Sequence, residues 1–234
     1  TCVGCSNIAD IQYNVEFSAK LHQAFIGGIA GEVDTSSIDA AYNTGMISAD
    51  ISKTGQVWCG GIVGIVKNAS DINNVFNIGT IKSEATQGDA ATLTAGGLIG
   101  QFGGSNGYPK NATYLQNSAS SGIYNKSGKL VDDQTSEVNS KTVEELQGDD
   151  FLAQCNQTKA ITKYEIVWEK DSKSGYPKIK SAMRINSAPT FLSGVPSEVK
   201  TSIDVGEEYS VNLTSTFYDE DGDPITYTVK VNDA

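Results

Sequence analysis

The fold is decided by the stretch FIGGIAGEV at residues 25–33, which returns as WCGGIVGIV at 58–66 and as TAGGLIGQF at 94–102. The three segments align without gaps, and their glycine pairs begin at residues 27, 60 and 96. A segment that recurs at steps of 33 and 36 residues is typical of a repeat architecture, in which each unit buries its apolar face against the next unit.

A second shared segment follows the glycine segment in each copy. IDAAYNTGMI at 38–47 matches INNVFNIGTI at 72–81, and the third copy retains only a degraded ATYLQNS at 112–118, after an insertion at 103–109. We interpret the N-terminal residues as a broken earlier copy, in which Tyr13-Asn14 stands in place of Tyr42-Asn43.

Apolar residues recur within each copy at a period of two, which predicts β-strands rather than helices. The same column holds the same character in successive copies, so we expect the copies to stack like on like. A neighbouring column is mostly polar and is expected to face outward. The apolar columns are Ile29, Ile62 and Leu98, and Val33, Val66 and Phe102; the polar column is Glu32, Ile65 and Gln101.

The glycine pairs have two structural explanations. They either supply backbone torsions that are closed to other residues or allow the next layer to approach closely. A phosphate-binding loop at Gly27-Gly28-x-x-Gly31 is a weak alternative, because no helical pattern follows it. The repeated Asn43 and Asn77 suggest a ladder of stacked amides.

The G-G-[IL]-x-G core followed by [YF]-N-x-G resembles the GLUG motif of bacterial cell-surface and secreted proteins, including repeat regions of some immunoglobulin-A peptidases. The resemblance covers about residues 1–182, and the Trp168 and Gly175-Tyr176-Pro177 of the tail support it. It implies a β-solenoid-like stack at the cell surface and no catalytic residues. We therefore expect an all-β chain with β-solenoid repeats and a C-terminal cap at 1–184.

Thr142-x-x-Glu145 has the pattern of a capping box, which satisfies two backbone donors at the start of a helix. The last strand of a stack has unpaired backbone N–H and C=O groups that can pair with other chains. We therefore expect the residues after this box, Leu146, Phe151 and Leu152, to cover the open end of the stack. Trp168 and Tyr176 are interpreted as core of that cap, with a ligand platform as the alternative.

Residues 185–234 form a second expected module. They contain strand-like alternation around the stretch FYDEDGDP at 217–224, and 187–234 hold nine acidic residues and two lysines. This resembles the opening half of a bacterial cadherin-like or immunoglobulin-like β-sandwich. Such a domain needs about 90–100 residues, so only a partial sandwich is present.

Asp219, Asp221 and Asp223 alternate in that stretch, with Gly222 at the turn. Alternating carboxylates suit a hard cation that prefers oxygen ligands, so we predict a calcium site at these three residues. It is not an EF-hand, because no Glu follows at the twelfth position. An acidic, solvated turn is the alternative.

The four cysteines are Cys2, Cys5, Cys59 and Cys155. The C-x-x-C at the N-terminus lacks the strand–helix context of a redox pair, and a four-cysteine zinc site would need a second close pair. We expect small buried apolar residues, with one disulfide if the protein is secreted. His22, the single histidine, is expected to lie exposed in a linker.

The 234 residues carry 28 acids and 17 Lys or Arg, a net charge of −11. This charge repels phosphates and argues against nucleic acid and anionic membranes as partners. No apolar run reaches the roughly 18 residues of a membrane span. We expect a piece of a longer protein, for which a missing signal peptide is uninformative about secretion.

These features favour a non-catalytic module of a bacterial cell-surface or secreted protein, an adhesin or stalk that meets a host or cell-surface protein or glycan. An enzyme is disfavoured because acids such as Asp39, Asp71 and Asp89 are scattered over turns and outward columns rather than paired. The third hypothesis is a carbohydrate- or protein-binding module attached to a secreted enzyme. It would require Tyr42 and Phe76, which share a column, to face solvent.

Overall fold

The computed structural model describes residues 1–16, 23–52, 55–87, 92–125, 137–157, 164–184, 190–191, 217–219 and 225. The chain divides into two compact units, Thr1–Met183 and Arg184–Ala234. His22 lies outside the described residues. The described part is almost entirely β, so the expected all-β class is confirmed.

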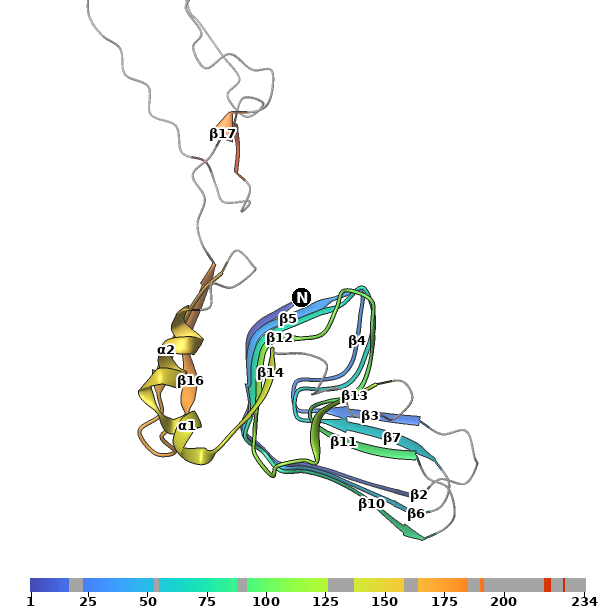
Figure 1. Ribbon diagram of the computed structural model, residues 1–234. Coiled ribbons are helices and arrows are strands. Elements are labelled where there is room, and N and C mark those ends of the chain that lie inside the picture. The colour runs from blue at the N-terminus through green and yellow to red at the C-terminus, as the bar shows by residue number, and fades with distance from the viewer. Residues whose placement is uncertain are drawn as a thin grey trace, which may run out of the picture. The chain divides into compact units, whose positions relative to one another are not determined.

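Apart from the last two, the strands of the first unit form three parallel sheets (Figure 1). The five-stranded sheet contains, in spatial order, β1 (Cys2–Asn7), β5 (Ser37–Asn43), β9 (Asp71–Asn77), β12 (Lys110–Leu115) and β14 (Val138–Lys141). The three-stranded sheet contains β2 (Ile11–Glu16), β6 (Ile47–Ser52) and β10 (Ile81–Gln87). The six-stranded sheet contains β3 (Gln23–Gly27), β4 (Ala30–Asp34), β7 (Gln56–Gly60), β8 (Val63–Asn68), β11 (Thr92–Gly104) and β13 (Ser121–Asn125).

Each copy of the repeat forms one layer, and layers pair with the copies before and after them in parallel register. Gly27 lies opposite Gly60, and Gly60 lies opposite Gly96. The second segment follows the same rule, since Tyr42 lies opposite Phe76. The glycine-paired segments are therefore neighbours in space, as the recurrence predicts.

The six-stranded sheet bends at the glycine pairs. β3 and β4 are two halves of one layer, and so are β7 and β8, whereas β11 continues through the bend and pairs with β7 before it and β8 after it. The two halves face different cores. The first core lies between β4, β8 and the five-stranded sheet, and the second lies between β3, β7 and the three-stranded sheet. In cross-section the layers therefore have two arms that meet at the glycines (Figure 1).

The glycine pairs are explained by close approach. Neither Gly28 nor Gly61 has a positive φ. A Cβ on Gly28 would lie 2.7 Å from Asn43 Cγ and would also strike the carbonyl oxygen of Gly61. The first of the two structural explanations offered by the sequence is thus wrong at these positions, and the second is correct.

The amide ladder predicted from Asn43 and Asn77 is present and extends one layer further. Asn43 Nδ2 donates to Asn77 Oδ1 at 2.7 Å, and Asn7 Nδ2 donates to Asn43 Oδ1 at 2.7 Å. The alignment of Tyr13-Asn14 with Tyr42-Asn43 is therefore wrong. Ser6-Asn7 occupies that register, because β1 rather than β2 continues the five-stranded sheet.

The cap comprises α1 (Val143–Gln147), α2 (Asp149–Gln157) and a hairpin-like pair, β15 (Tyr164–Lys170) and β16 (Pro177–Arg184). The capping box is confirmed, with Thr142 Oγ1 accepting from Glu145 N and Glu145 Oε2 accepting from Thr142 N. Trp168 is buried, and Tyr176 packs against the cluster that contains it, as expected for cap core.

The expected position of the cap is wrong. Leu146, Phe151 and Trp168 pack against side chains from three successive layers of the five-stranded sheet rather than against the last layer. The reason is chemical: that face of the sheet presents large apolar side chains. These are Tyr42 of β5, Phe76 of β9 and Leu115 of β12.

The second unit contains β17 (Thr190–Phe191) paired antiparallel with β18 (Phe217–Tyr218). Among the described residues, neither helix has the length and apolar character to cross a membrane.

Candidate functional site

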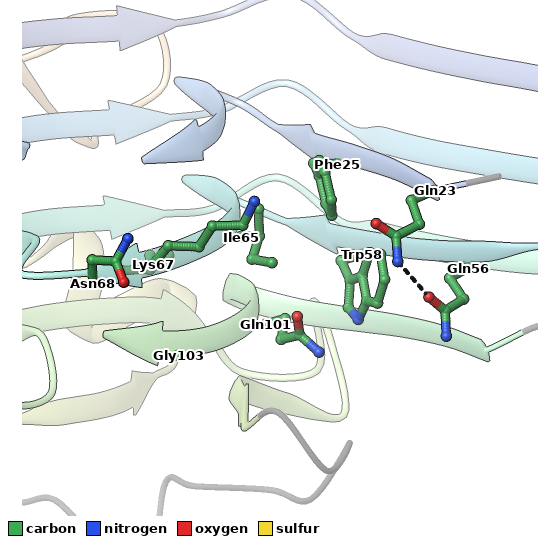
Figure 2. Close-up of a pocket in the computed structure, with 10 residues that line it drawn as sticks. Gln23, Phe25, Gln56, Trp58, Ile65, Lys67, Asn68, Gln101 and Gly103 are labelled. Atoms are coloured by element: carbon green, nitrogen blue, oxygen red, sulfur yellow. Dashed lines mark hydrogen bonds between the residues drawn. The ribbon is translucent and has the colours of Figure 1, made fainter. Parts of the chain in front are cut away.

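An open hollow of about 520 Å³ lies where the six-stranded sheet bends (Figure 2). Its walls come from the two halves of the sheet and span three layers. The lining residues are Gln23 and Phe25 of β3, Gln56 and Trp58 of β7, Ile65, Val66, Lys67 and Asn68 of β8, and Gln101 and Gly103 of β11. We call this the aromatic hollow.

An aromatic pair forms one wall of the aromatic hollow. Phe25 and Trp58 lie opposite each other in register, and their rings stack with centroids 5.1 Å apart and planes inclined by 21°. Phe25 is half-buried and Trp58 is 5% exposed. The pair is on the outer side of its strands because the neighbouring residues, such as Ile26 and Cys59, point into the second core.

Amides continue the same wall toward the strand starts. Gln23 Nε2 donates to Gln56 Oε1 at 2.8 Å, again between successive layers. Gln101 of β11 belongs to the other half of the sheet, where it lies opposite Ile65 of β8 (Figure 2). Each such amide carries donors and an acceptor, so the wall offers both kinds of hydrogen-bonding group beside flat apolar rings.

The opposite wall contains a balanced charge. Lys67 Nζ lies 5.2 Å from the Phe25 ring centroid and 2.9 Å from Glu32 Oε2. Asn68, which follows Lys67, donates a hydrogen bond to the Asp34 carboxylate, and Thr35 donates another. These bonds lower the pKa of Asp34, the bond from Asn68 having the larger effect. Lys67, Glu32 and Asp34 together carry a net charge of −1, so the aromatic hollow holds no excess of positive charge.

The predicted calcium site falls largely outside the described residues. Asp219 follows β18 and is 8% exposed, whereas Asp221 and Asp223 lie outside the described part. In that part, no group of three or more His, Cys, Asp or Glu side chains is placed to hold a metal ion. Calcium at Asp219, Asp221 and Asp223 stays a prediction.

Tyr42 and Phe76 do not form a surface for sugars. Their rings stack at 5.2 Å, but Tyr42 is 7% exposed and Phe76 is 2% exposed, beneath Trp168 and Phe151. The shared column is confirmed, and the condition that these rings face solvent is not met, because the cap covers them.

Two of the three acids named from the sequence, Asp39 and Asp71, lie in the described part of the chain, and each accepts a hydrogen bond from an asparagine of another layer. Asp39 is 1% exposed and accepts a hydrogen bond from Asn74 Nδ2 at 2.6 Å. The expectation that Asp39 lies in a turn or an outward column is therefore wrong. Asp71 is exposed and accepts from Asn106 Nδ2 at 3.3 Å, while Asp89 lies outside the described residues.

Cys2 and Cys5 form a disulfide in β1, and Cys59 and Cys155 are free thiols. Burial raises the pKa of both free thiols to about 12. A thiol with such a pKa is a poor nucleophile near neutral pH, so these two cysteines act as packing residues.

The aromatic hollow was not identified from the sequence, although its signal is there. The first residues of the three aligned segments are Phe25, Trp58 and Thr94, and a glutamine precedes the first two by two positions. The alignment does not show that each layer bends after these residues, and it is the bend that turns this side of the sheet into a hollow.

No family model, curated protein or solved structure matches the chain. The resemblances named from the sequence motifs therefore stay predictions.

Proposed function

We propose that this chain is a non-catalytic module of a bacterial cell-surface or secreted protein and that it acts there as an adhesin or stalk. On this proposal the first unit is a β-solenoid of the GLUG type, and the second is the opening part of a β-sandwich. The observation that carries the proposal is the parallel pairing of successive copies, Gly27 with Gly60 and Gly60 with Gly96.

The recurring polar residues support a scaffolding role, because they bond to the next layer. Asn43 and Asn77 are fully buried and bonded to each other. A second ladder runs from Asn74 to Asp39 and from Asn111 to Asn74. Buried amides in such ladders satisfy one another and specify which layer meets which.

An extracellular location is supported by the Cys2–Cys5 disulfide, since disulfides persist in oxidising compartments and are rare in the cytosol. The net charge of −11 keeps an exposed module soluble and suits partners other than nucleic acid.

A second candidate function is a carbohydrate- or protein-binding module attached to a secreted peptidase or polysaccharide-degrading enzyme. The condition set for it at Tyr42 and Phe76 is not met. What favours it is the aromatic hollow, where the half-buried Phe25 ring lies beside amides on the outer side of the sheet.

The test immobilises the full chain and measures retention of glycans and of extracellular proteins, alongside assays for new reducing ends and new amino groups. We expect retention of a ligand with no product released. Retention of nothing would leave the stalk role alone. Steady release of product, absent from a heat-denatured control, would overturn the non-catalytic assignment.

A further inference from the structure

We infer that the aromatic hollow binds a neutral oligosaccharide chain that lies along the stacking axis. This deepens the recognition role proposed above and rests on it. The aromatic hollow crosses three layers, from Gln23 and Phe25 through Trp58 to Gln101.

Periodicity is the first argument. Neighbouring layers of a sheet are about 4.8 Å apart, and on the wall formed by β3 and β7 chemically similar groups recur at that step in two layers, with Thr92 and Thr94 opposite them in the third. Phe25 stacks on Trp58, and Gln23 bonds to Gln56. A polymer of pyranose rings joined end to end repeats on a similar scale, so two successive sugars meet β3 and β7 in the same way.

Chemistry is the second argument. The apolar face of a sugar ring packs on an aromatic face or edge, while its hydroxyl groups both donate and accept hydrogen bonds. The amides of Gln56, Gln101 and Asn68 supply both partners within one hollow. Ligand sites of this type combine apolar walls with a few polar groups that fix orientation.

Charge decides between neutral and acidic sugars. Lys67 is the one cation among the lining residues, and its ammonium group is already paired with Glu32 at 2.9 Å. With that charge balanced and the chain strongly acidic, a polyanionic glycan is repelled.

A polypeptide is disfavoured by the direction of the backbone hydrogen bonds. The strands that form the walls bond to their neighbours along the stacking axis, as β7 does to β3 and β11. Inside the hollow the walls thus present side chains, and a peptide lying there cannot pair with them as a further strand, which is the usual source of affinity for extended peptides.

The experiment is electrophoresis of the full, folded chain in native gels that contain soluble polysaccharide, followed by calorimetric titration with oligosaccharides of two to six units. The neutral probes are xylan, glucomannan and mixed-linkage glucan, and the acidic probes are polygalacturonate and heparin. We expect a neutral polymer to retard the chain, and affinity to rise with oligosaccharide length up to the span of three layers.

Three variants locate the binding. Phe25→Ala and Gln101→Ala should each weaken binding about tenfold, since each removes one wall contact. Gln116→Ala, which removes an exposed amide outside the aromatic hollow, should leave it unchanged. Circular dichroism checks that each variant is folded; Gln101→Ala, the milder change, keeps the test valid if Phe25→Ala unfolds.

The inference is overturned if no probe retards the chain, if only the acidic probes do, if an unfolded polypeptide such as reduced casein binds in their place, or if all three variants bind like the parent. Any of these leaves the stalk role standing. Release of reducing ends from a probe would instead overturn the non-catalytic function.

Discussion

At the scale of single residues, the layers share backbone conformations even where they do not share residues. Thr35 and Asn68 end β4 and β8 at equivalent positions, and both have a φ of 48°. In the five-stranded sheet a left-handed residue recurs in every one of four layers, at Gly4, Ala40, Asn74 and Asn111. Asn and Gly adopt this region readily, whereas a β-branched residue such as Thr does so at a cost.

Thr35→Asn should therefore stabilise the protein. We expect the free energy of unfolding to rise by about 1 kcal/mol, because Asn relieves left-handed strain at an exposed position. Urea denaturation measures it. Thr80→Asn, at an exposed threonine without a positive φ, is the matched control and should give no gain. Equal effects at both sites would contradict the explanation.

Asp171 gives a prediction about pH. Ser174 N and Oγ donate to its carboxylate at 2.9 and 2.8 Å, and Lys178 Nζ lies 3.2 Å away; these bonds lower its pKa from 3.8 to about 2. A carboxyl whose pKa is lower in the folded state stabilises the fold above pH 3.8. That contribution is lost as the pH falls to about 2.

Asp171→Asn should accordingly lower the melting temperature near neutral pH. The difference from the parent should shrink between about pH 4 and pH 2, because the parent then loses the same contribution. Melting curves recorded across this range measure it. A difference that stays constant down to pH 2 would show that the carboxylate charge is not what stabilises this turn.

At the scale of elements, the glycine pair sets the spacing between layers. A Cβ on Gly61 would strike the Gly97 carbonyl oxygen and would also meet the Asn77 side chain. The Gly97 oxygen is a backbone atom of the next layer, so a change of side-chain rotamer cannot remove the clash.

Gly61→Ala should therefore lower the free energy of unfolding by about 3 kcal/mol or more. Gly107→Ala separates steric from conformational effects, since Gly107 has a φ of +94° and a Cβ there would meet no atom within 4 Å. It should cost only about 1 kcal/mol. Denaturant unfolding measures the loss of unfolding free energy in both variants. A larger loss for Gly107→Ala than for Gly61→Ala would contradict the role assigned to the glycine pair.

The cap is held by aromatic packing on the face of the five-stranded sheet. Trp168 lies 5.8 Å from Tyr42 and 5.6 Å from Phe76, measured between ring centroids. We expect Trp168→Ala to lower the free energy of unfolding by about 3–5 kcal/mol. Tyr164→Ala changes an exposed aromatic residue of the same strand and should stay within about 0.5 kcal/mol of the parent. Thermal unfolding compares the two, and similar losses would refute this packing.

At the scale of the whole molecule, the two units differ in how their predicted stability arises. The first unit has apolar cores between its sheets and ladders between its layers. For the second unit, the proposed source of stability is a cation at the acidic stretch 217–224.

Calcium should therefore raise the melting temperature of the chain, and a chelator should reverse the change. Calcium at 100 times its dissociation constant stabilises a folded state by about 2.7 kcal/mol. Asp221→Asn should abolish the shift, whereas Asp204→Asn, an acid of the same unit outside the stretch, should preserve it. Identical melting curves with calcium and with chelator would refute the calcium site and favour the alternative, an acidic, solvated turn.

The amino-acid pattern by itself determined the period of the repeat, the β class, the apolar columns, the Asn43–Asn77 ladder, the capping box and the burial of Trp168. These follow from it because each layer meets a near-copy of itself, so neighbours along the stack can be found by alignment. Only the tertiary structure decided that Asn7 continues the ladder, that the cap lies on the face of the five-stranded sheet, and that Phe25 and Trp58 border a hollow. Those features depend on the bend within a layer and on contacts between segments that do not repeat, and no column of the alignment records them.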